Sequence, residues 1–273
     1  MPEALSTGKA GEPYPVIRIA HLYPSLLNVA GDGGNVIAIR RRTAWRGIAT
    51  NVVPVEFGDS RDLTTFDLIV VQGGQDLEMA IAARDLQVRA ETLQDAADAG
   101  VVIFAVCAGL QLLGHRYIPA TGPAIEGIGL LDLETRAGEQ RFMQHAACQV
   151  GFGEEVQTIV GFENHSGLTE LGSGLRPFGT VIAGAGNNGR DGTEGARRDN
   201  IYATYLHGPV LPKNPWLADF LIQIVLERKL GEPIQLAELD DSLEQSAHDL
   251  ALDVALRNRG RRTALEPAQL GRG

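Results

Sequence analysis

The fold is decided by residues 101–114, VVIFAVCAGLQLLG. The apolar run Val101–Ala105 is rich in β-branched residues and predicts a buried strand, and an apolar helix is expected to begin just after Cys107. Cys107 therefore lies at a sharp strand-to-helix turn, which requires small neighbours such as Ala108 and Gly109. A thiol placed there, beside a helix N-terminus, is favoured as a thiolate. These local residues are also compatible with an inert buried cysteine.

Length, composition and charge narrow the class of protein. The chain has 273 residues, 44% of them hydrophobic, which is enough for one large α/β core and a tail. Lys and Arg number 24 against 34 Asp and Glu, so binding to nucleic acid through its phosphates is not expected. Two cysteines make no disulfide framework. Without a leader or a long apolar run in the sequence, we expect no transmembrane segment and a cytoplasmic protein.

Predicted strands and helices alternate over the first half of the chain. The expected strands are Val16–His21, Asn51–Phe57, Asp67–Val71 and Val101–Ala105, and the expected helices are Val36–Arg46 and Leu77–Ala99. This order predicts an α/β fold with a mostly parallel sheet flanked by helices, in which ligands bind at the carboxyl ends of the strands. Pro54 favours a position at the sheet edge for the strand that contains it.

The second half of the chain has a different pattern. Short strand-like pieces alternate with glycine turns over Ile125–Ala183, which predicts antiparallel structure packed against the sheet. Gly184–Asn200 is rich in glycine and charge, and we expect an exposed loop there. Ile201–Leu206 is a predicted strand, Trp216–Leu230 a predicted helix, and a further helical segment begins at Ala237.

Two residues that follow predicted strands could form a catalytic pair. Cys107 and His207 each come directly after such a run, so both side chains are expected at one edge of the sheet, where the histidine could serve the thiol as base and acid. Gly73 and Gly74 follow another strand, and their N–H groups could stabilise an oxyanion. Asp32 stands just before a predicted helix, where a helix cap is the simpler interpretation.

The motifs resemble a known family. Residues 106–111, VCAGLQ, are similar to the G-x-C-x-G-x-Q nucleophile elbow of class I (triad-type) glutamine amidotransferases, with Ala105 at the first glycine. Residues 22–36, 161–167, 186–195 and 204–215 resemble the glutaminase subunits of lipid II isoglutaminyl synthase, the GatD family, in the cobyric acid synthase-like group. The resemblance implies a flavodoxin-like amidotransferase domain over residues 15–231, after a flexible N-terminal arm (1–14) and before a C-terminal helix and basic tail (232–273).

The resemblance also implies roles for individual residues. Cys107 would be the nucleophile and His207 the general base and acid, with oxyanion donors Gly73, Gly74 and Ala108. Arg141 would bind the glutamine carboxylate, and Gln111, Asn164 and His165 would contact the rest of the substrate. The family usually carries H-x-E, where this chain has Pro209. Asp32 is therefore a candidate third member of the triad that orients His207.

Partners follow from the same resemblance. The substrate would be L-glutamine, and the ammonia would pass to a Mur-ligase-like subunit (MurT) that amidates D-glutamate in lipid II, at the inner face of the membrane. The sequence has no G-x-x-x-x-G-K-S/T segment, so we expect no cofactor in this chain and ATP with Mg²⁺ on the partner. No metal site is expected, and the partner contact is predicted at the 184–200 loop or the C-terminal helix. The alternatives are amidation of corrinoid side chains and a non-catalytic scaffold.

Overall fold

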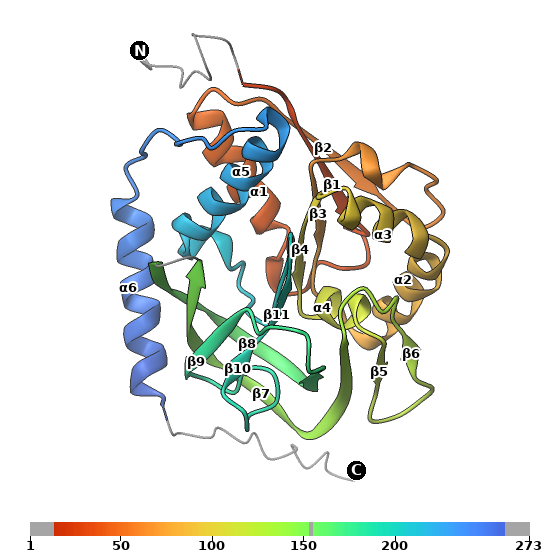
Figure 1. The fold of residues 1–273 in the computed structure, drawn as a ribbon. Helices are drawn as coiled ribbons and strands as arrows, with labels where there is room; N and C mark the ends of the chain where they lie inside the picture. The colour runs from red at the N-terminus through yellow and green to blue at the C-terminus, as the bar shows by residue number, and fades with distance from the viewer. Residues whose placement is uncertain (1–13, 153–154, 260–273) are drawn as a thin grey trace, which may run out of the picture.

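The computed structural model describes residues 14–152 and 155–259. Its first sheet has the strand order β11-β12-β4-β3-β1-β2 (Figure 1). All neighbours in it are parallel except β11 and β12. The strands are β1 (Ile17–Leu22), β2 (Thr50–Val55), β3 (Leu68–Val71), β4 (Val102–Val106), β11 (Ala196–Arg198) and β12 (Ile201–Thr204). The mostly parallel sheet is confirmed, and the strand containing Pro54 lies at its edge, as predicted. The expected arm at 1–14 and the basic tail lie almost entirely outside the described residues.

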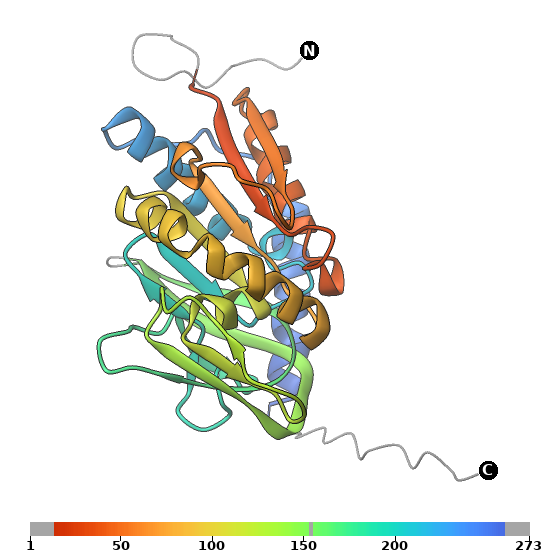
Figure 2. The same ribbon diagram turned by 90° about the vertical axis from the view of Figure 1, so that its right-hand side faces the viewer.

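Helices cover both faces of this sheet. Figures 1 and 2 show α1 (Gly34–Trp45) and α5 (Pro215–Leu230) on one face, and α2 (Asp76–Val88) and α3 (Ala90–Asp98) on the other. The single helix predicted over Leu77–Ala99 is wrong, because the chain leaves helical geometry at Arg89 (φ −96°, ψ 0°). The Arg89 side chain turns back to pair with Asp85 at 2.6 Å, and both are buried. No helix in the described ranges is long and apolar enough to cross a membrane.

Strand order brings the candidate catalytic residues to one edge. The order β2-β1-β3-β4-β12 is that of a flavodoxin-like sheet, in which ligands bind outside the carboxyl ends of the strands. Asp32 lies in the segment after β1, Gly73 after β3, Cys107 after β4 and His207 after β12. Segments up to 175 residues apart in sequence therefore converge at this edge.

The second sheet is built on one long hairpin. Strands β7 (Leu133–Phe152) and β8 (Glu155–Leu171) pair along almost their whole length, so the expectation of only short strands over Ile125–Ala183 is wrong. Burial alternates along β8, where every second residue from Gly161 to Thr169 faces the core. This pattern is that of one continuous strand with one buried face, which accounts for the length of β8. The sheet is completed by β5 (Arg116–Ile118), β6 (Ile125–Glu126), β9 (Gly179–Ala183) and β10 (Thr193–Glu194), and all its pairs are antiparallel except β5 with β7.

The segment Gly184–Asn200 is not the exposed loop that its composition predicted. Asn187, Asn188 and Glu194 are all buried. Asn187 Nδ2 donates to the carbonyl oxygen of Gly195, and Asn188 Nδ2 donates to that of Thr169. These amide groups satisfy backbone carbonyls that would otherwise be buried unpaired, which lets a glycine-rich segment pack inside the protein.

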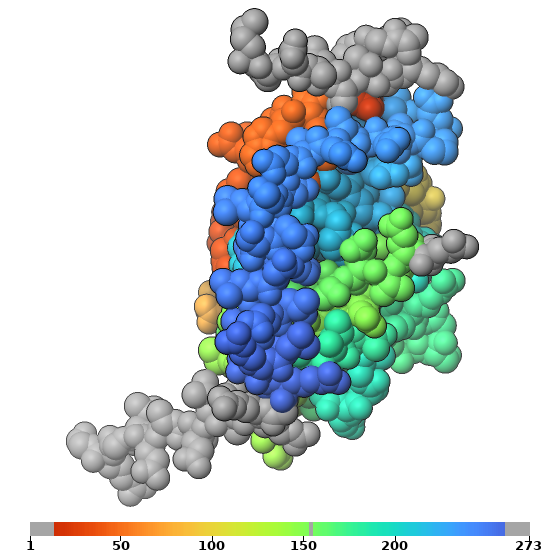
Figure 3. All heavy atoms as spheres, turned by 90° about the vertical axis from the view of Figure 1, so that its left-hand side faces the viewer, coloured from red at the N-terminus to blue at the C-terminus, as the bar shows by residue number. Residues whose placement is uncertain are grey.

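The C-terminal helix α6 (Ser242–Arg257) lies against the second sheet. It begins five residues later than Ala237, the predicted start. Its Ala255 joins a small apolar cluster with Ala147, Val160 and Ala183 from β7, β8 and β9. Figure 3 shows α6 as a continuous ridge beside these strands.

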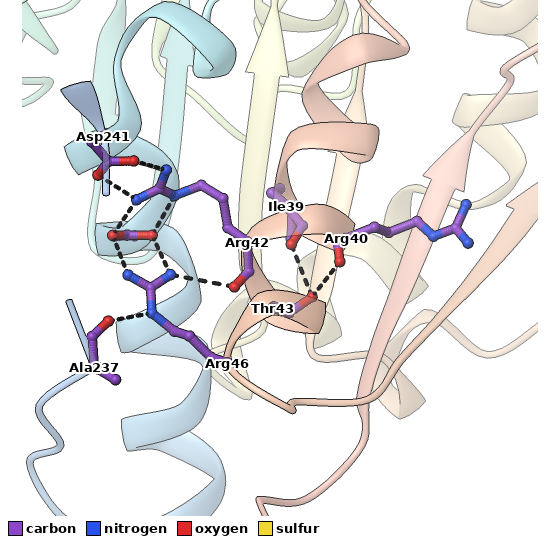
Figure 4. A network of polar contacts seen from close by, with 8 residues as sticks. Ile39, Arg40, Arg42, Thr43, Arg46, Ala237 and Asp241 are labelled. Atoms are coloured by element: carbon purple, nitrogen blue, oxygen red, sulfur yellow. Dashed lines mark hydrogen bonds and ion pairs between the residues drawn. The ribbon is translucent and has the colours of Figure 1, made fainter. Parts of the chain in front are cut away.

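A buried ionic network ties α1 to α5 and to the segment before α6. Arg42 of α1 and Arg46, the residue directly after that helix, both pair with Asp219 of α5 at 2.6 Å. Arg42 also pairs with Asp241, and Arg46 donates to the Ala237 carbonyl (Figure 4). Burial disfavours a charged Arg42, but both aspartates outweigh it and raise its pKa. The path of the chain into α6 is thereby fixed.

Candidate active site

Cys107 occupies the strained turn that its sequence predicts. Its backbone has φ 49° and ψ −101°, outside the regions that a residue with a Cβ prefers. The short helix α4 (Ala108–Leu113) follows at once, and it lies so close to β3 that a Cβ at Gly109 would be 2.5 Å from the Val71 carbonyl oxygen. The Cys107 N–H donates to the Thr204 carbonyl at 2.8 Å, which fixes the turn to β12. The thiol is 6% exposed.

His207 is held from its backbone and from its ring. A two-way bridge to Phe162 of β8 fixes the backbone, with N–O distances of 2.9 and 3.1 Å. The ring Nδ1 lies 2.8 Å from Oδ2 of Asp32, and both side chains are buried. Because a carboxylate only accepts, Nδ1 carries the hydrogen and Nε2 faces away from Asp32. Nε2 is buried without a hydrogen-bond partner among the described residues.

Asp32 is not the N-cap of α1, so the interpretation of Asp32 as the cap of that helix is wrong. The N-cap of α1 is Gly33, which has no side chain to offer. The turn η2 (Val29–Gly31) precedes Asp32, with Ala30 at φ 56° and Gly31 at φ 74°, and it directs the Asp32 carboxylate into the protein. There Oδ2 accepts from His207 and, at 3.2 Å, from the Gly73 N–H. The predicted contact between Asp32 and His207 is present.

Pro209 fills the position where the family usually has glutamate. It packs against the start of α1, where a Cβ on Gly34 would lie only 2.4 Å from the Pro209 Cγ. The carboxylate beside His207 thus comes from the loop after β1 and not from the residue two positions after the histidine. Asp32 thus takes the third position beside His207 in a candidate group with Cys107.

The charges at this site favour a positively charged His207. Burial by itself lowers the pKa of His207, but a negative charge on Cys107 and the Asp32 carboxylate together raise it to about 10. The thiol must be close to the ring to have this effect. At neutral pH the raised pKa keeps the His207 ring positively charged, which places a cation beside Cys107, the candidate nucleophile.

The structure separates Gly73 from the other two predicted oxyanion donors. The Gly73 N–H donates to Asp32 in this structure. Gly73 also has no room for a side chain, because a Cβ would lie 2.5 Å from the His207 ring. Gly74 is next to the elbow, since its Cβ would lie 3.7 Å from the Ala108 Cβ. Gly74 and Ala108 are therefore the candidate donors, and Gly73 supports Asp32.

Gln111 belongs to a buried chain of hydrogen bonds. Its Nε2 donates to the Tyr205 hydroxyl at 3.0 Å, which in turn lies 2.6 Å from Thr169 Oγ1. The charge of Cys107 contributes, after burial, to a raised pKa of Tyr205, so this phenol is also close to the thiol. Sequence reasoning missed Tyr205. Its position two residues before His207 was the available signal, because residues i and i+2 of a strand share a face.

Arg141, Asn164 and His165 lie together on the β7–β8 hairpin. The pairing shifts between Ala137 and Phe142, so that Arg141 lies in a bulge, and bulges often redirect a side chain. The exposed Arg141 donates from Nε to Asn164 Oδ1 at 2.9 Å. It lines a cavity of about 590 Å³ to which neither Cys107 nor His207 contributes.

His165 is a neutral, buried ring. It stacks on Tyr205 with ring centroids 3.9 Å apart, and its Nδ1 donates to the Gly167 carbonyl at 2.9 Å. Burial lowers the pKa of His165 to about 3, and the charges of His207 and Arg141 act in the same direction. His165 thus connects Arg141 electrostatically with the catalytic group.

Comparison with known proteins identifies a family and several similar chains. Residues 18–215 match the CobB/CobQ-like glutamine amidotransferase domain. The GatD subunit of the glutamine-hydrolysing lipid II isoglutaminyl synthase of Streptococcus pneumoniae is 35% identical over 92% of this chain and 96% of its own. The Staphylococcus aureus GatD subunit is 36% identical over 89% of this chain and 98% of its own. The PurLQS structure from Thermotoga maritima has the same fold, with a TM-score of 0.55 and 17% identity over 79% of this chain and 98% of that one.

Proposed function

Because this chain belongs to the CobB/CobQ-like glutamine amidotransferase family, we propose that it is the glutaminase subunit of a lipid II isoglutaminyl synthase. It hydrolyses L-glutamine to glutamate and ammonia, and a Mur-ligase-like partner uses the ammonia to amidate D-glutamate in the lipid II stem peptide. The observation that carries the hydrolysis is the group formed by Cys107, His207 and Asp32 at the carboxyl ends of β4, β12 and β1. The two GatD relatives, matched over nearly their whole length, support the choice of acceptor.

In the first step the Cys107 thiolate attacks the carboxamide carbon of glutamine. Negative charge moves to the amide oxygen, where the N–H groups of Gly74 and Ala108 stabilise it, and the loss of one such donor typically costs about 3 kcal/mol of barrier. The His207 imidazolium donates its Nε2 proton to the leaving nitrogen. The C–N bond breaks, ammonia leaves, and a thioester joins the glutamyl group to Cys107.

In the second step water hydrolyses the thioester. Neutral His207 takes a proton from the attacking water at Nε2, and the C–S bond breaks to release glutamate and regenerate the thiolate. Throughout, Asp32 holds the ring through Nδ1 and stabilises its positive charge. The three residues thus account for both proton transfers.

Glutamine is held by two sets of residues. Arg141 offers a planar guanidinium to the substrate carboxylate, and its bond to Asn164 limits where the fork can point. Gln111 and His165 line the other side, both fixed to Tyr205. His165 is neutral, and its Nε2 has no hydrogen-bond partner in the part of the chain that the structure describes, so it can accept a hydrogen bond from a substrate N–H.

The ligase partner supplies the rest of the reaction. MurT would bind ATP and Mg²⁺, activate the acceptor carboxylate and take up the ammonia at the cytoplasmic face of the membrane. Residues 184–200 and α6 both border the cavity beside Arg141, which supports them as candidates for the contact.

The proposal is tested on the co-expressed complex. Glutamate release is measured with and without the ligase subunit, and amidation of lipid II is followed with glutamine as nitrogen source. We expect glutamine-dependent amidation of lipid II. Amidation of a corrinoid acid in place of lipid II would support the alternative substrate, and no glutamate release under any condition would support the scaffold alternative.

A further inference from the structure

Glu194 is a buried carboxyl group that the proposed reaction does not use. It is 1% exposed on β10. Its Oε1 accepts from Thr204 Oγ1 at 2.9 Å and from the Tyr205 N–H at 2.7 Å. Its Oε2 is buried without a hydrogen-bond partner among the described residues. Burying a carboxyl group costs folding free energy. We therefore expect the hydrogen bonds that Glu194 makes to have a role in the protein.

The contact is with the backbone that leads to His207. Strand β12 ends at Thr204, so the next N–H groups have left the sheet and need other acceptors. Tyr205 finds one in the Glu194 carboxylate. Leu206 donates to Thr204 Oγ1 at 3.0 Å, the same hydroxyl that donates to Glu194. One side chain thus fixes two successive residues, one directly and one through a hydroxyl group.

The fixed segment contacts Cys107 and Gln111 and leads directly to His207. The Thr204 carbonyl accepts the N–H of Cys107. The Tyr205 hydroxyl accepts from Gln111. His207 follows two residues later. We propose that Glu194 is a positioning residue for glutamine hydrolysis, whose carboxylate holds the Thr204–Leu206 backbone and thereby aims His207 at Cys107. This inference rests on the proposed function for its substrate.

The charge of Glu194 matters because an ionised acceptor makes the stronger bond. Burial raises the pKa of Glu194 to about 7, although the bonds from Tyr205 and Thr204 oppose the shift. Two other titratable groups face it, Glu163 on β8 and Cys148 on β7, and burial raises the pKa of both. As pH falls through about 7, Glu194 takes up a proton and its hold on the backbone weakens. Activity is therefore expected to fall on this acid limb.

The test uses two substitutions of Glu194 in the co-expressed complex. Glu194→Ala should lower kcat for glutamine about 10- to 100-fold with KM changed by less than about threefold, because alignment is lost and not binding. Glu194→Gln keeps an acceptor oxygen without the charge, and should restore kcat to within about fivefold of wild type, with a flat profile between about pH 6 and 8.

Glu163→Gln is the matched control. Glu163 is also buried and accepts backbone N–H groups, but from Ala185 and Gly186 and not from the Thr204–Leu206 segment. It should keep the wild-type kcat and retain an acid limb, shifted to lower pH because the Glu163 charge contributes to the raised pKa of Glu194. Thermal melting shows how much stability each lost carboxylate contributes. An acid limb that persists in Glu194→Gln or disappears in Glu163→Gln would overturn the inference, as would an active Glu194→Ala.

A second readout does not depend on glutamine. The alkylation rate of Cys107 by iodoacetamide, followed by peptide mass spectrometry, reports the thiolate that His207 stabilises. The alkylation rate should be lower in Glu194→Gln near neutral pH and unchanged in Glu163→Gln. An unchanged rate in Glu194→Gln would contradict the inference even if the wild-type complex releases no glutamate, which would refute only the proposed function.

Discussion

Oδ2 of Asp32 lies 2.8 Å from Nδ1 of His207, although the two residues are 175 positions apart. The carboxylate that orients the histidine therefore comes from the loop after β1, and Pro209 occupies the place of the usual glutamate. The strand order of a flavodoxin-like sheet makes the exchange possible, because the ends of β1 and β12 open onto the same edge.

Asp32→Asn should lower kcat about 10²- to 10⁴-fold, because an amide can stabilise the wrong tautomer and cannot stabilise the imidazolium. His207 donates its proton only below its raised pKa of about 10. Removing the Asp32 charge lowers that pKa, so the alkaline limb of kcat should move to lower pH. The control is Asp67→Asn, a buried carboxylate at the opposite ends of the strands, paired with Lys229. An alkaline limb that stays in place in Asp32→Asn would contradict the assignment.

Substitutions of the two cysteines should have opposite effects on glutamine hydrolysis. Cys107→Ala should abolish glutamine hydrolysis without unfolding the protein, because it removes the nucleophile and leaves the small residue that the turn needs. Cys148→Ala removes an equally buried thiol that lies in the second sheet. It should retain hydrolysis. Glutamate release and circular dichroism on both variants check this, and loss of activity in Cys148→Ala alone would show that the nucleophile is misassigned.

Arg141→Ala should raise the KM for glutamine about 10- to 100-fold with kcat nearly unchanged, because it removes a charge-assisted pair worth about 1.5–3 kcal/mol. Arg141→Lys should recover only part of the loss, since an ammonium lacks the fork. Arg136→Ala is the control on the same strand, an exposed arginine paired with Glu134. Steady-state kinetics of glutamine hydrolysis are measured for all three variants. Equal KM values for Arg141→Ala and Arg136→Ala would place Arg141 outside the site.

Gly34→Ala should destabilise the fold by about 1–3 kcal/mol, since a methyl group there would collide with Pro209. Gly174→Ala has open space around the new Cβ and should be close to neutral. Urea unfolding measures both. A Gly34→Ala variant as stable as wild type would mean that the Pro209 contact adapts freely.

The placement of Cys107 and His207 at one edge of the sheet was predictable, because its sequence signals are local. A strand, a tight turn and small residues mark Cys107, and a strand followed by His207-Gly208 marks the histidine. The role of Asp32 needed tertiary structure, because its sequence context equally suggests a cap. The same holds for Gly73, whose N–H points to Asp32 and not toward the elbow.

Burial of polar residues was the main feature that the sequence concealed. Glu194 lies in a glycine-rich, charged segment that looks solvated, yet its partners Thr204 and Tyr205 belong to a strand end and bury it. The break at Arg89 was hidden for a related reason, since the ion pair with Asp85 forms only when both are packed inside. Such contacts depend on the assembled fold, and residue patterns do not contain them.

The most direct test of the central claim uses Cys107→Ala in the complex with the ligase subunit, with amidation of lipid II measured from two nitrogen sources. Ammonium salts should support amidation at the wild-type level, because the ligase site is intact, and glutamine should support none. Glutamine-driven amidation that survives this substitution would contradict the account.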